Sequence, residues 1–578
     1  MTNHEFVKHF RFTAILIFWG TIGAFLRLYL ITDQVLLDDE WHGLFYATGH
    51  PLVYLLHNTD AAATSAPMNA YAWMLLHTTG WSEMALRLPS LVPGLMALVI
   101  LPLLVRRIHG EAVAGIFAAF LSLSPFLTFY SRIFRPYSAL TFFEFIAIYS
   151  AGIWLYTGEK RFHWLCLFAS AAALYFHPVA VIGVLAPWAV AGALYFWSRK
   201  AVHGDRIPNF RPGWWSVMLT AGLIMLMFVL TVQPSIITES IVPGSSPGID
   251  TWKQFMLMLF GTTSVILAVG LTLCCLIGAL SLFRDNPFWG LTFTLVVFLH
   301  LLMTALCRFS DINVPIVLTR YLIILIPLGH VVTAIGLKRC AVGIGRFAIF
   351  RKPLIRGLSF ALVISIFASW VLTNPLWYAY AAPNNFTNHS AFIESGQFGG
   401  WDKLYRSCFL PQSVSSAQPR MSAFYRNLPP RTQRLIEYPM MLGDHYNYYY
   451  FYQHHHGKQI VIGYMDIVDD MPPNREGVDA ELLVDHVIRA AHDKRSSRFG
   501  NMVDILDVEA VWRSRADYLI CHKNLFAEFL PGARLPDRIP VSGIKECIKQ
   551  STKHFGPPVF EDETVVVFNV ADSQPATR

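Results

Sequence analysis

The acidic run Asp38-Asp39-Glu40, with His42 close behind, has the residue types needed for acid–base chemistry. The run follows a long apolar segment that ends near Thr32. Adjacent carboxylates repel one another and raise one another's proton affinity, so three in a row are unfavourable. A role for one of them as a general base would explain why they are kept. Charged runs also occur simply to solvate the end of a loop, and spacing alone leaves both interpretations open.

Arginines in short hydrophilic stretches between apolar segments form a second group of candidates. Ser131-Arg132-Ile133-Phe134-Arg135-Pro136-Tyr137 joins two apolar segments, and Arg320-Tyr321 opens another. A planar guanidinium matches phosphate oxygens, so Arg132, Arg135 and Arg320, with Tyr137 and Tyr321, are candidates to bind a lipid phosphate. The alternative is that an arginine at a helix end only reaches the lipid headgroups, which is what we expect of Arg27 and Arg87.

His42 and His177 are candidate contacts for a substrate or a metal ion. His177 precedes Pro178 between two apolar segments, where a simple polar turn residue is the competing interpretation. The run His454-His455-His456 has no carboxylate or cysteine at ligand spacing and defines no metal site. No cofactor is therefore predicted with certainty, the metal is unknown, and a divalent ion remains an option. Glu144, inside an apolar segment, is either functional or paired with an arginine.

The elements that position these residues are predicted to be membrane spans. Charged residues make up 14% of the chain, against about 25% in soluble domains, and apolar residues reach 54%. Mean hydropathy is +0.43. A spanning helix needs roughly 20 apolar residues, and we count about eleven such windows. They are 12–32, 88–105, 112–130, 137–157, 162–176, 178–197, 214–233, 262–283, 288–306, 319–337 and 357–374.

Basic residues set the orientation of these spans, because cytoplasmic loops are enriched in lysine and arginine. The clusters that fall on one side include Lys8/Arg11, Arg106/Arg107, Lys160/Arg161 and the stretch from Lys338 to Arg356. That side is predicted to be the cytoplasm, with the N-terminus. The loop 33–87 and everything after 374 then face outward. Because the basic clusters alternate with apolar runs, the net charge of +7 does not indicate nucleic acid.

Residues 375–578 have the composition of a separate outward domain. The runs Gln459–Ile462, Tyr518–Ile520 and Thr564–Phe568 are predicted strands, and Ala480–Asp493 has apolar residues at helical spacing. We therefore expect a polytopic α-helical membrane protein, residues 1–374, followed by an extramembrane α/β domain.

The eight cysteines contain no CxxC pair. Five of them lie in or beside apolar segments, where buried reduced thiols are expected. Those five are Cys166, Cys274, Cys275, Cys307 and Cys340. Only Cys408, Cys521 and Cys547 could pair in the outward domain.

On these motifs the chain resembles the C-type glycosyltransferase superfamily, in the branch of the protein O-mannosyltransferases and the lipid A aminoarabinose transferase. The resemblance is carried by Asp39-Glu40 in the first outward loop, Ser131 to Tyr137, Arg320-Tyr321-Leu322, and spans followed by an outward domain. It implies a polyprenyl- or dolichyl-phosphate sugar donor, with Asp39 near the acceptor hydroxyl. The triplet has one acid more than the expected pair, so the base stays open between Asp38 and Asp39. No WWDYG-type signature is present, which disfavours an oligosaccharyltransferase.

The predicted function is transfer of a single sugar, with inversion, from a polyprenyl-phosphate donor to an extracytoplasmic glycolipid, polysaccharide or protein. The expected location is a bacterial inner membrane, with the C-terminal domain in the periplasm and membrane lipids as partners. The alternative is a polytopic lipid or sugar transporter or flippase. Transporters place charge near the midplane of paired halves, whereas here no internal repeat is evident and the outward charges gather at span ends.

Overall fold

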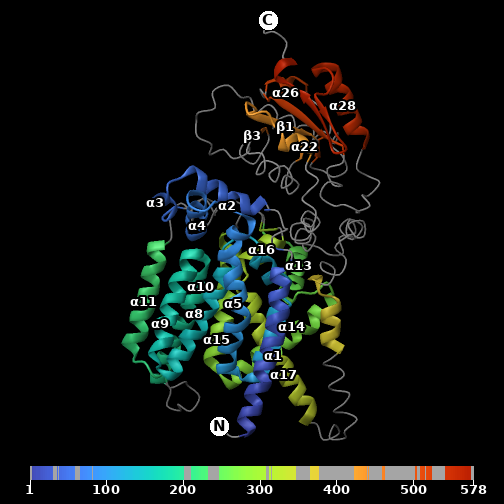
Figure 1. Cartoon of the computed structure of the whole chain (residues 1–578). Coiled ribbons are helices and arrows are strands. Elements are labelled where there is room, and N and C mark those ends of the chain that lie inside the picture. The colour runs from blue at the N-terminus through green and yellow to red at the C-terminus, as the bar shows by residue number, and fades with distance from the viewer. Residues whose placement is uncertain are drawn as a thin grey trace. The chain divides into compact units, whose positions relative to one another are not determined.

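The computed structural model describes the residues to which the structural statements below apply. These are 3–29, 31, 36, 38–58, 65–80, 82–200, 210–231, 246–307, 312–313, 315–346, 365–376, 422–438, 440–441, 459–461, 502–503, 508–513, 516–523 and 541–573. Figure 1 shows a long helical bundle in the N-terminal two-thirds and a small sheet domain near the C-terminus.

The N-terminal two-thirds is helical throughout its described ranges (Figure 1). The helices are α1 (Asn3–Leu28), α2 (Asp38–Gly49), α3 (Leu52–Leu55), α4 (Ala66–His77), α5 (Glu83–His109), α6 (Glu111–Ser122), α7 (Pro125–Ser131), α8 (Tyr137–Thr157), α9 (Lys160–Phe176), η2 (Pro178–Ala180), α10 (Val181–Lys200), α11 (Trp214–Thr231), α13 (Ile249–Phe260), α14 (Val265–Asp285), α15 (Pro287–Cys307), α16 (Pro315–Tyr321) and α17 (Leu325–Arg346). Residues 365–372 are also helical.

Seven helices within the described ranges are long and apolar enough to cross a membrane, or eight if α6 and α7, bent by 61°, form one broken span. The predicted multi-pass helical fold is confirmed, but the count of eleven spans is not. Helices α9 and α11 occupy two further predicted windows and are shorter than the seven, and the window 357–374 is described only in part.

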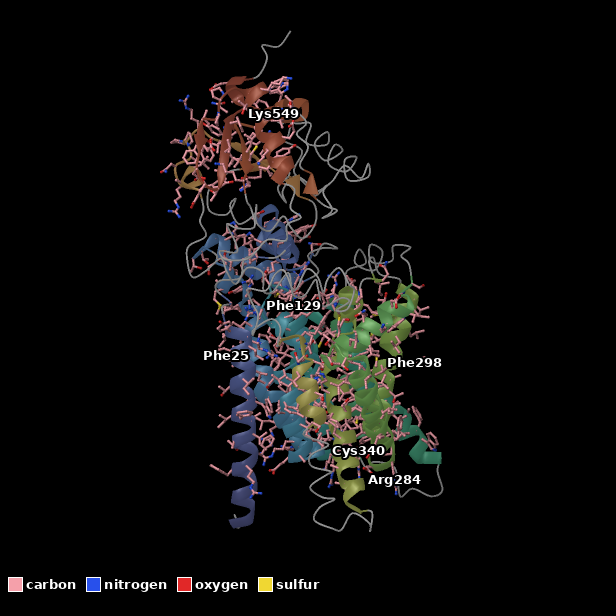
Figure 2. The ribbon with its side chains drawn as sticks, turned by 90° about the vertical axis from the view of Figure 1, so that its right-hand side faces the viewer. Phe25, Phe129, Arg284, Phe298, Cys340 and Lys549 are labelled. Carbon is pink, nitrogen blue, oxygen red and sulfur yellow. The ribbon has the colours of Figure 1, made fainter. Side chains whose placement is uncertain are left out.

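Large apolar side chains cover the outside of these helices. Figure 2 labels Phe25 on α1 and Phe298 on α15, which are 55% and 58% exposed. In water such an exposed apolar surface would be unfavourable, whereas it packs well against lipid tails. Helices also satisfy their own backbone hydrogen bonds, as the interior of a membrane requires. The exposed apolar surface therefore agrees with a membrane-embedded bundle.

Two glycines allow α14 and α17 to pack with their backbones in contact. A Cβ added to Gly278 would strike the Val332 carbonyl, and one added to Gly336 would strike the Cys274 carbonyl. Small residues at such crossings are the usual means of close helix packing in a membrane, where burial of apolar surface gives no driving force. Helices α14 and α17 therefore pack closely against each other within the bundle.

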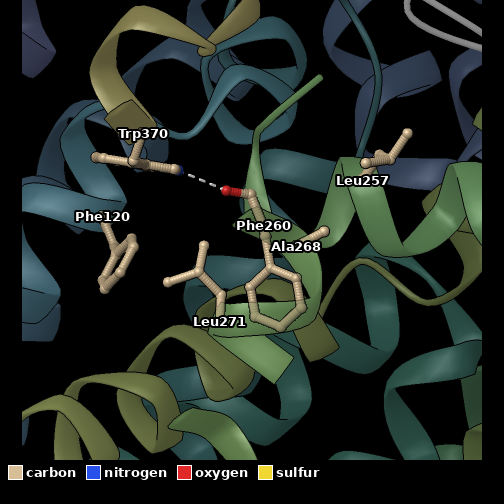
Figure 3. Packing of buried hydrophobic residues seen from close by; sticks show 6 residues of the cluster. All are labelled: Phe120, Leu257, Phe260, Ala268, Leu271 and Trp370. Atoms are coloured by element: carbon tan, nitrogen blue, oxygen red, sulfur yellow. Dashed lines mark hydrogen bonds between the residues drawn. The ribbon is translucent and has the colours of Figure 1, made fainter. Parts of the chain in front are cut away.

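An apolar cluster joins α6, α13 and α14 to the helix at 365–372 (Figure 3). Its buried members are Phe120, Leu257, Phe260, Ala268, Leu271 and Trp370. The Trp370 indole N–H donates to the Phe260 carbonyl at 2.7 Å, which satisfies a group that burial would otherwise leave unpaired. The cluster thereby packs together chain segments that are distant in sequence.

The C-terminal domain is built on a five-stranded sheet in the order β3-β1-β5-β7-β6. The strands are β1 (Arg434–Tyr438), β3 (Gln459–Val461), β5 (Tyr518–His522), β6 (Phe560–Glu561) and β7 (Val565–Asn569), with β2 (Met440–Met441) and β4 (Met502–Val503) as a separate antiparallel pair. β1 is parallel to β3 and β5, and β7 is antiparallel to β5 and β6. The remaining elements are α22 (Ala423–Arg426), α26 (Val508–Arg513), α28 (Val541–Phe555) and η6 (Ala571–Ser573).

The predicted α/β character of this domain is confirmed at all three expected strands, which are β3, β5 and β7. The expected helix Ala480–Asp493 and the run His454-His455-His456 lie outside the described residues. β1 and α28 were not predicted, because β1 has a glutamate at its fourth position and α28 carries many charged residues on its exposed face.

The chain's contacts divide it into two compact units. The first comprises residues 1–31, 46–382 and 397–405, and the second 32–45, 383–396 and 406–578. The first unit, called the membrane unit below, contains the long apolar helices. The second contains the C-terminal sheet and the acidic run.

Candidate active site

Four of the predicted site residues converge in the membrane unit: Tyr137, His177, Arg320 and Tyr321, called the aromatic–arginine cluster below. The His177 ring lies 5.8 Å from the Tyr137 ring and 6.4 Å from the Tyr321 ring. The Arg320 guanidinium carbon is 5.5 Å from the centre of the Tyr321 ring, within cation–π range. Three separate chain segments thus supply one polar cluster.

Helix ends position each of these side chains. Tyr137 opens α8 directly after Pro136, and Arg320 and Tyr321 close the short helix α16. His177 terminates α9, where Pro178 removes the next backbone donor and begins the 3-10 turn η2. Helix ends carry unpaired backbone groups, so polar side chains are better tolerated there than within a span.

His177 is held as a neutral ring with a defined tautomer. Burial lowers the pKa of His177 to about 4, and the positive charge of Arg320 acts in the same direction. Its Nδ1 accepts the backbone N–H of Val179 at 3.2 Å, so the ring proton resides on Nε2. His177 therefore presents an N–H donor rather than a cation.

Arg135 lies in the bend between α7 and α8 and is held there through its backbone. Its N–H donates to Ser90 Oγ at 3.3 Å, and the Ser90 hydroxyl donates to its carbonyl at 2.8 Å. Arg132 and Arg135 are both in this bend, so helical spacing does not describe them. Ser90, on α5, is a residue that the sequence did not single out.

Arg132 is fully buried and its guanidinium contacts the end of α1. Its Nη1 donates to the carbonyls of Leu26, Arg27 and Tyr29 at 3.0, 3.3 and 2.7 Å. The last carbonyls of a helix have no partner inside the helix, and an arginine is well suited to satisfy them. These contacts give Arg132 a positioning role at the point where the chain leaves α1.

Arg27 and Arg87 do not extend to the headgroups, and that expectation was wrong. Both are buried: Arg27 donates to Ser131 Oγ at 3.2 Å and to the Gly23 carbonyl at 3.0 Å, and Arg87 donates to the Ile31 carbonyl at 3.0 Å. A buried charge persists only with such partners. The Gly23 carbonyl lies in α1 itself, whereas the contacts with Ser131 and Ile31 require α1 to pack against α7 and α5, which no sequence pattern reveals.

The acidic run forms the beginning of α2, in the second compact unit. Asp38, Asp39 and Glu40 occupy its first turn, where the helix dipole favours negative charge, and His42 follows in the next turn. The Glu40 side chain is fully buried. The run is thus part of a helix rather than of an irregular loop.

Neither a metal nor an arginine partner for Glu144 is found in the described part of the chain. Its His, Cys, Asp and Glu side chains form no group of three or more suited to a metal ion. Glu144 is buried in α8 against Gly183 of α10, where a Cβ would collide with its carboxyl oxygen. Glu144 takes part in no ion pair among the described residues.

No protein-family model and no curated protein matches this chain. Among solved structures, the chain is similar to ArnT from Cupriavidus metallidurans in the apo state, with a TM-score of 0.48 and 11% identity over 98% of this chain and 99% of that one. The same enzyme bound to undecaprenyl phosphate also gives a TM-score of 0.48 and 11% identity, covering 98% and 100% of the two chains.

An oligosaccharyltransferase from Archaeoglobus fulgidus, tethered to an acceptor peptide, gives a TM-score of 0.47 and 12% identity, covering 94% of this chain and 72% of that one. These likenesses concern the course of the chain alone. They assign no role to any residue of the aromatic–arginine cluster.

Proposed function

We propose that this protein is a membrane glycosyltransferase that moves a single sugar from a polyprenyl-phosphate carrier to an acceptor outside the cytoplasmic membrane. The observation that carries the proposal is the aromatic–arginine cluster, in which Arg320 and the neutral N–H donor of His177 converge from different helix ends. A cation and a neutral donor together suit a phosphate oxygen, and flanking aromatic rings suit a sugar or a lipid.

In the proposed reaction, the acceptor hydroxyl oxygen attacks the anomeric carbon of the donor sugar. The bond from that carbon to the phosphate oxygen breaks, and its electron pair leaves with the polyprenyl phosphate. Asp39, or Asp38, takes the proton of the hydroxyl group. The neighbouring Glu40 tunes the proton affinity of that base. Because the acceptor attacks directly from the face opposite the phosphate, the configuration at the anomeric carbon inverts.

Stabilisation of the departing phosphate is assigned to the membrane unit. Arg320 and Arg135 supply positive charge, and His177 Nε2 and the Tyr137 and Tyr321 hydroxyls supply neutral donors. Arg132 remains a candidate for this role, but the three carbonyls bound by its Nη1 support positioning more directly. The proposed reaction needs no divalent ion, and the described residues contain no group of three or more side chains suited to hold one.

The direct test uses membranes containing the protein and polyprenyl-phosphate carriers bearing labelled sugars. We expect label to move to a glycolipid, polysaccharide or protein acceptor in wild type. Arg320→Gln should reduce kcat by about 10²- to 10³-fold, as loss of one stabilising donor typically does. Asp39→Asn and Asp38→Asn, compared side by side, identify the base, whose loss should cost about 10²- to 10⁴-fold.

The matched control is Arg161→Gln, because Arg161 is 69% exposed and contacts Glu159 and the Phe162 ring at the opposite end of α9 from His177. It should retain wild-type transfer. Undiminished transfer in both Asp39→Asn and Arg320→Gln would overturn the residue assignment. Movement of the lipid-linked sugar across reconstituted bilayers, without transfer by wild type, would favour the transporter.

A further inference from the structure

Two cysteine sulfurs lie next to each other in the interior of the C-terminal domain. Cys521 is in β5 and Cys547 is in α28, and their Sγ atoms are 3.1 Å apart. A disulfide bond joins sulfurs at about 2.05 Å, so a shift of roughly 1 Å, within the reach of one side-chain rotation, would close it. Both residues are free thiols in the structure and both are buried.

The surrounding elements hold this pair in place. β5 is an interior strand of the sheet, where Cys521 is paired with Tyr438 of β1 and with Val566 of β7. α28 presents Ile544, Cys547 and Phe555 on its buried face. The two thiols therefore belong to elements whose packing already fixes their separation.

We propose that Cys521 and Cys547 form a disulfide bond in the mature protein and join α28 covalently to the centre of the sheet. This inference rests on the outward placement of the domain, where thiols meet an oxidising environment, and not on the transferase activity. It distinguishes this pair from Cys166, which is buried in α9 among apolar side chains.

The chemistry is a thiol–disulfide exchange with an oxidised dithiol protein of that compartment. One thiolate attacks the oxidant's disulfide and forms a mixed disulfide, and the second thiolate displaces the oxidant's sulfur. The two cysteines together lose two protons and two electrons, and the oxidant becomes a dithiol.

Once the domain has folded around the two cysteines, their oxidation is no longer favoured. Burial raises the pKa of the Cys521 thiol well above its usual range, with the nearby Cys547 thiol adding to the effect, so little thiolate forms. Oxidation should therefore take place while the domain folds. The bond then closes a loop from residue 521 to residue 547, which restricts the unfolded chain.

The test begins with the full-length protein in its own membranes, lysed in denaturant with N-ethylmaleimide and without reductant. After digestion, mass spectrometry should find a peptide pair linked through Cys521 and Cys547, two hydrogens lighter than the separate peptides. Cys166 in the same sample should carry the maleimide group and serves as the internal control. Alkylation of both Cys521 and Cys547 in most molecules, or linkage of either one to Cys408, would overturn the proposal.

A second measurement asks whether the bond stabilises the domain. Dithiothreitol should lower the temperature at which the C-terminal domain unfolds in the full-length wild-type protein by several degrees, and Cys547→Ser should remove this response. Cys166→Ser should keep it. A wild-type domain indifferent to reductant would contradict the proposed bond even if Cys547→Ser failed to fold. If the linked peptide is absent and sugar transfer persists, only the disulfide is overturned.

Discussion

The guanidinium of Arg132 works as a cap on the C-terminal end of α1. Three carbonyls at that end lie within 2.7–3.3 Å of its Nη1, and the side chain has no exposed surface. Hydrogen bonds from a charged donor contribute about 1.5–3 kcal/mol each, more than neutral ones. The position of the C-terminal end of α1 therefore depends on a residue of the bend between α7 and α8.

Replacing Arg132 by Gln should lower both stability and activity, because the end of α1 loses its partners. We expect a loss of about 1–3 kcal/mol for each buried carbonyl left without a donor, and a reduced kcat. Thermal unfolding and sugar transfer measure the two effects. Arg339→Gln is the control, since Arg339 is 45% exposed and its ion pair with Asp285 is a surface pair. Equal stability of the two variants would contradict the capping role.

His177 makes stability depend on pH through its lowered pKa. The unfolded ring binds a proton below about pH 6.5, whereas the folded ring binds one only near pH 4. Its contribution is thus fully present above pH 6.5 and is lost as pH falls from 6.5 toward 4, by on the order of 3 kcal/mol.

His177→Gln should flatten the fall in unfolding temperature across this pH range, because glutamine does not titrate. The glutamine amide can still donate near the position of Nε2, so transfer at neutral pH should exceed that of His177→Ala. The measurement is the unfolding temperature of wild type and both variants from pH 4 to pH 8. Parallel curves for wild type and His177→Gln would show that His177 is not held neutral.

The candidate residues could be predicted from the sequence, but not their grouping. Counting spans and basic loops places Tyr137, His177 and Arg320 on one side of the membrane, because this needs only hydropathy and charge. Their convergence depends on how α8, α9 and α16 pack, which is decided by side-chain shape. The burial of Arg27 could not be predicted for the same reason, because its partners include the Leu121 carbonyl and the Ser131 hydroxyl of neighbouring helices.

At the scale of elements, the membrane unit depends on close helix contacts more than on apolar burial. α14 and α17 meet through Gly278 and Gly336, and α8 accepts the Trp289 ring of α15 over Gly152. Each glycine admits a neighbouring backbone or ring where a methyl group would collide. The C-terminal domain instead rests on a sheet with buried apolar strands, which is why β3, β5 and β7 could be predicted, whereas β1, with Glu437, and the charged helix α28 could not.

Gly278→Val should separate α14 from α17 and destabilise the protein by several kcal/mol, because its side chain would meet the Val332 carbonyl rather than a flexible group. Gly270→Val is matched to it: the same change on the same helix, at a position where a Cβ meets nothing within 4 Å. Detergent-solubilised yield and unfolding temperature report the difference. If both variants behave alike, α14 and α17 do not pack through this glycine.

At the scale of the whole molecule, orientation decides which donor chemistry is available. Lipid-linked sugars are used on the outer side of a cytoplasmic membrane, whereas nucleotide sugars are found in the cytoplasm. The proposed site and the proposed disulfide both require that the turn between α4 and α5 and the C-terminal domain face outward. The start of α9, with Lys160 and Arg161, should then face the cytoplasm, in line with its basic character.

Cysteine labelling tests this orientation with two exposed positions, Thr79 in the turn between α4 and α5 and Lys160 at the start of α9. In spheroplasts, Thr79→Cys should react with a membrane-impermeant maleimide, and Lys160→Cys should react only after the membrane is permeabilised. Wild type gives the background from native cysteines, and both variants should react fully in detergent. The reverse pattern would place Asp38, Asp39 and Glu40 in the cytoplasm, where a nucleotide-sugar donor would replace the lipid-linked one and the Cys521–Cys547 bond would have no oxidant.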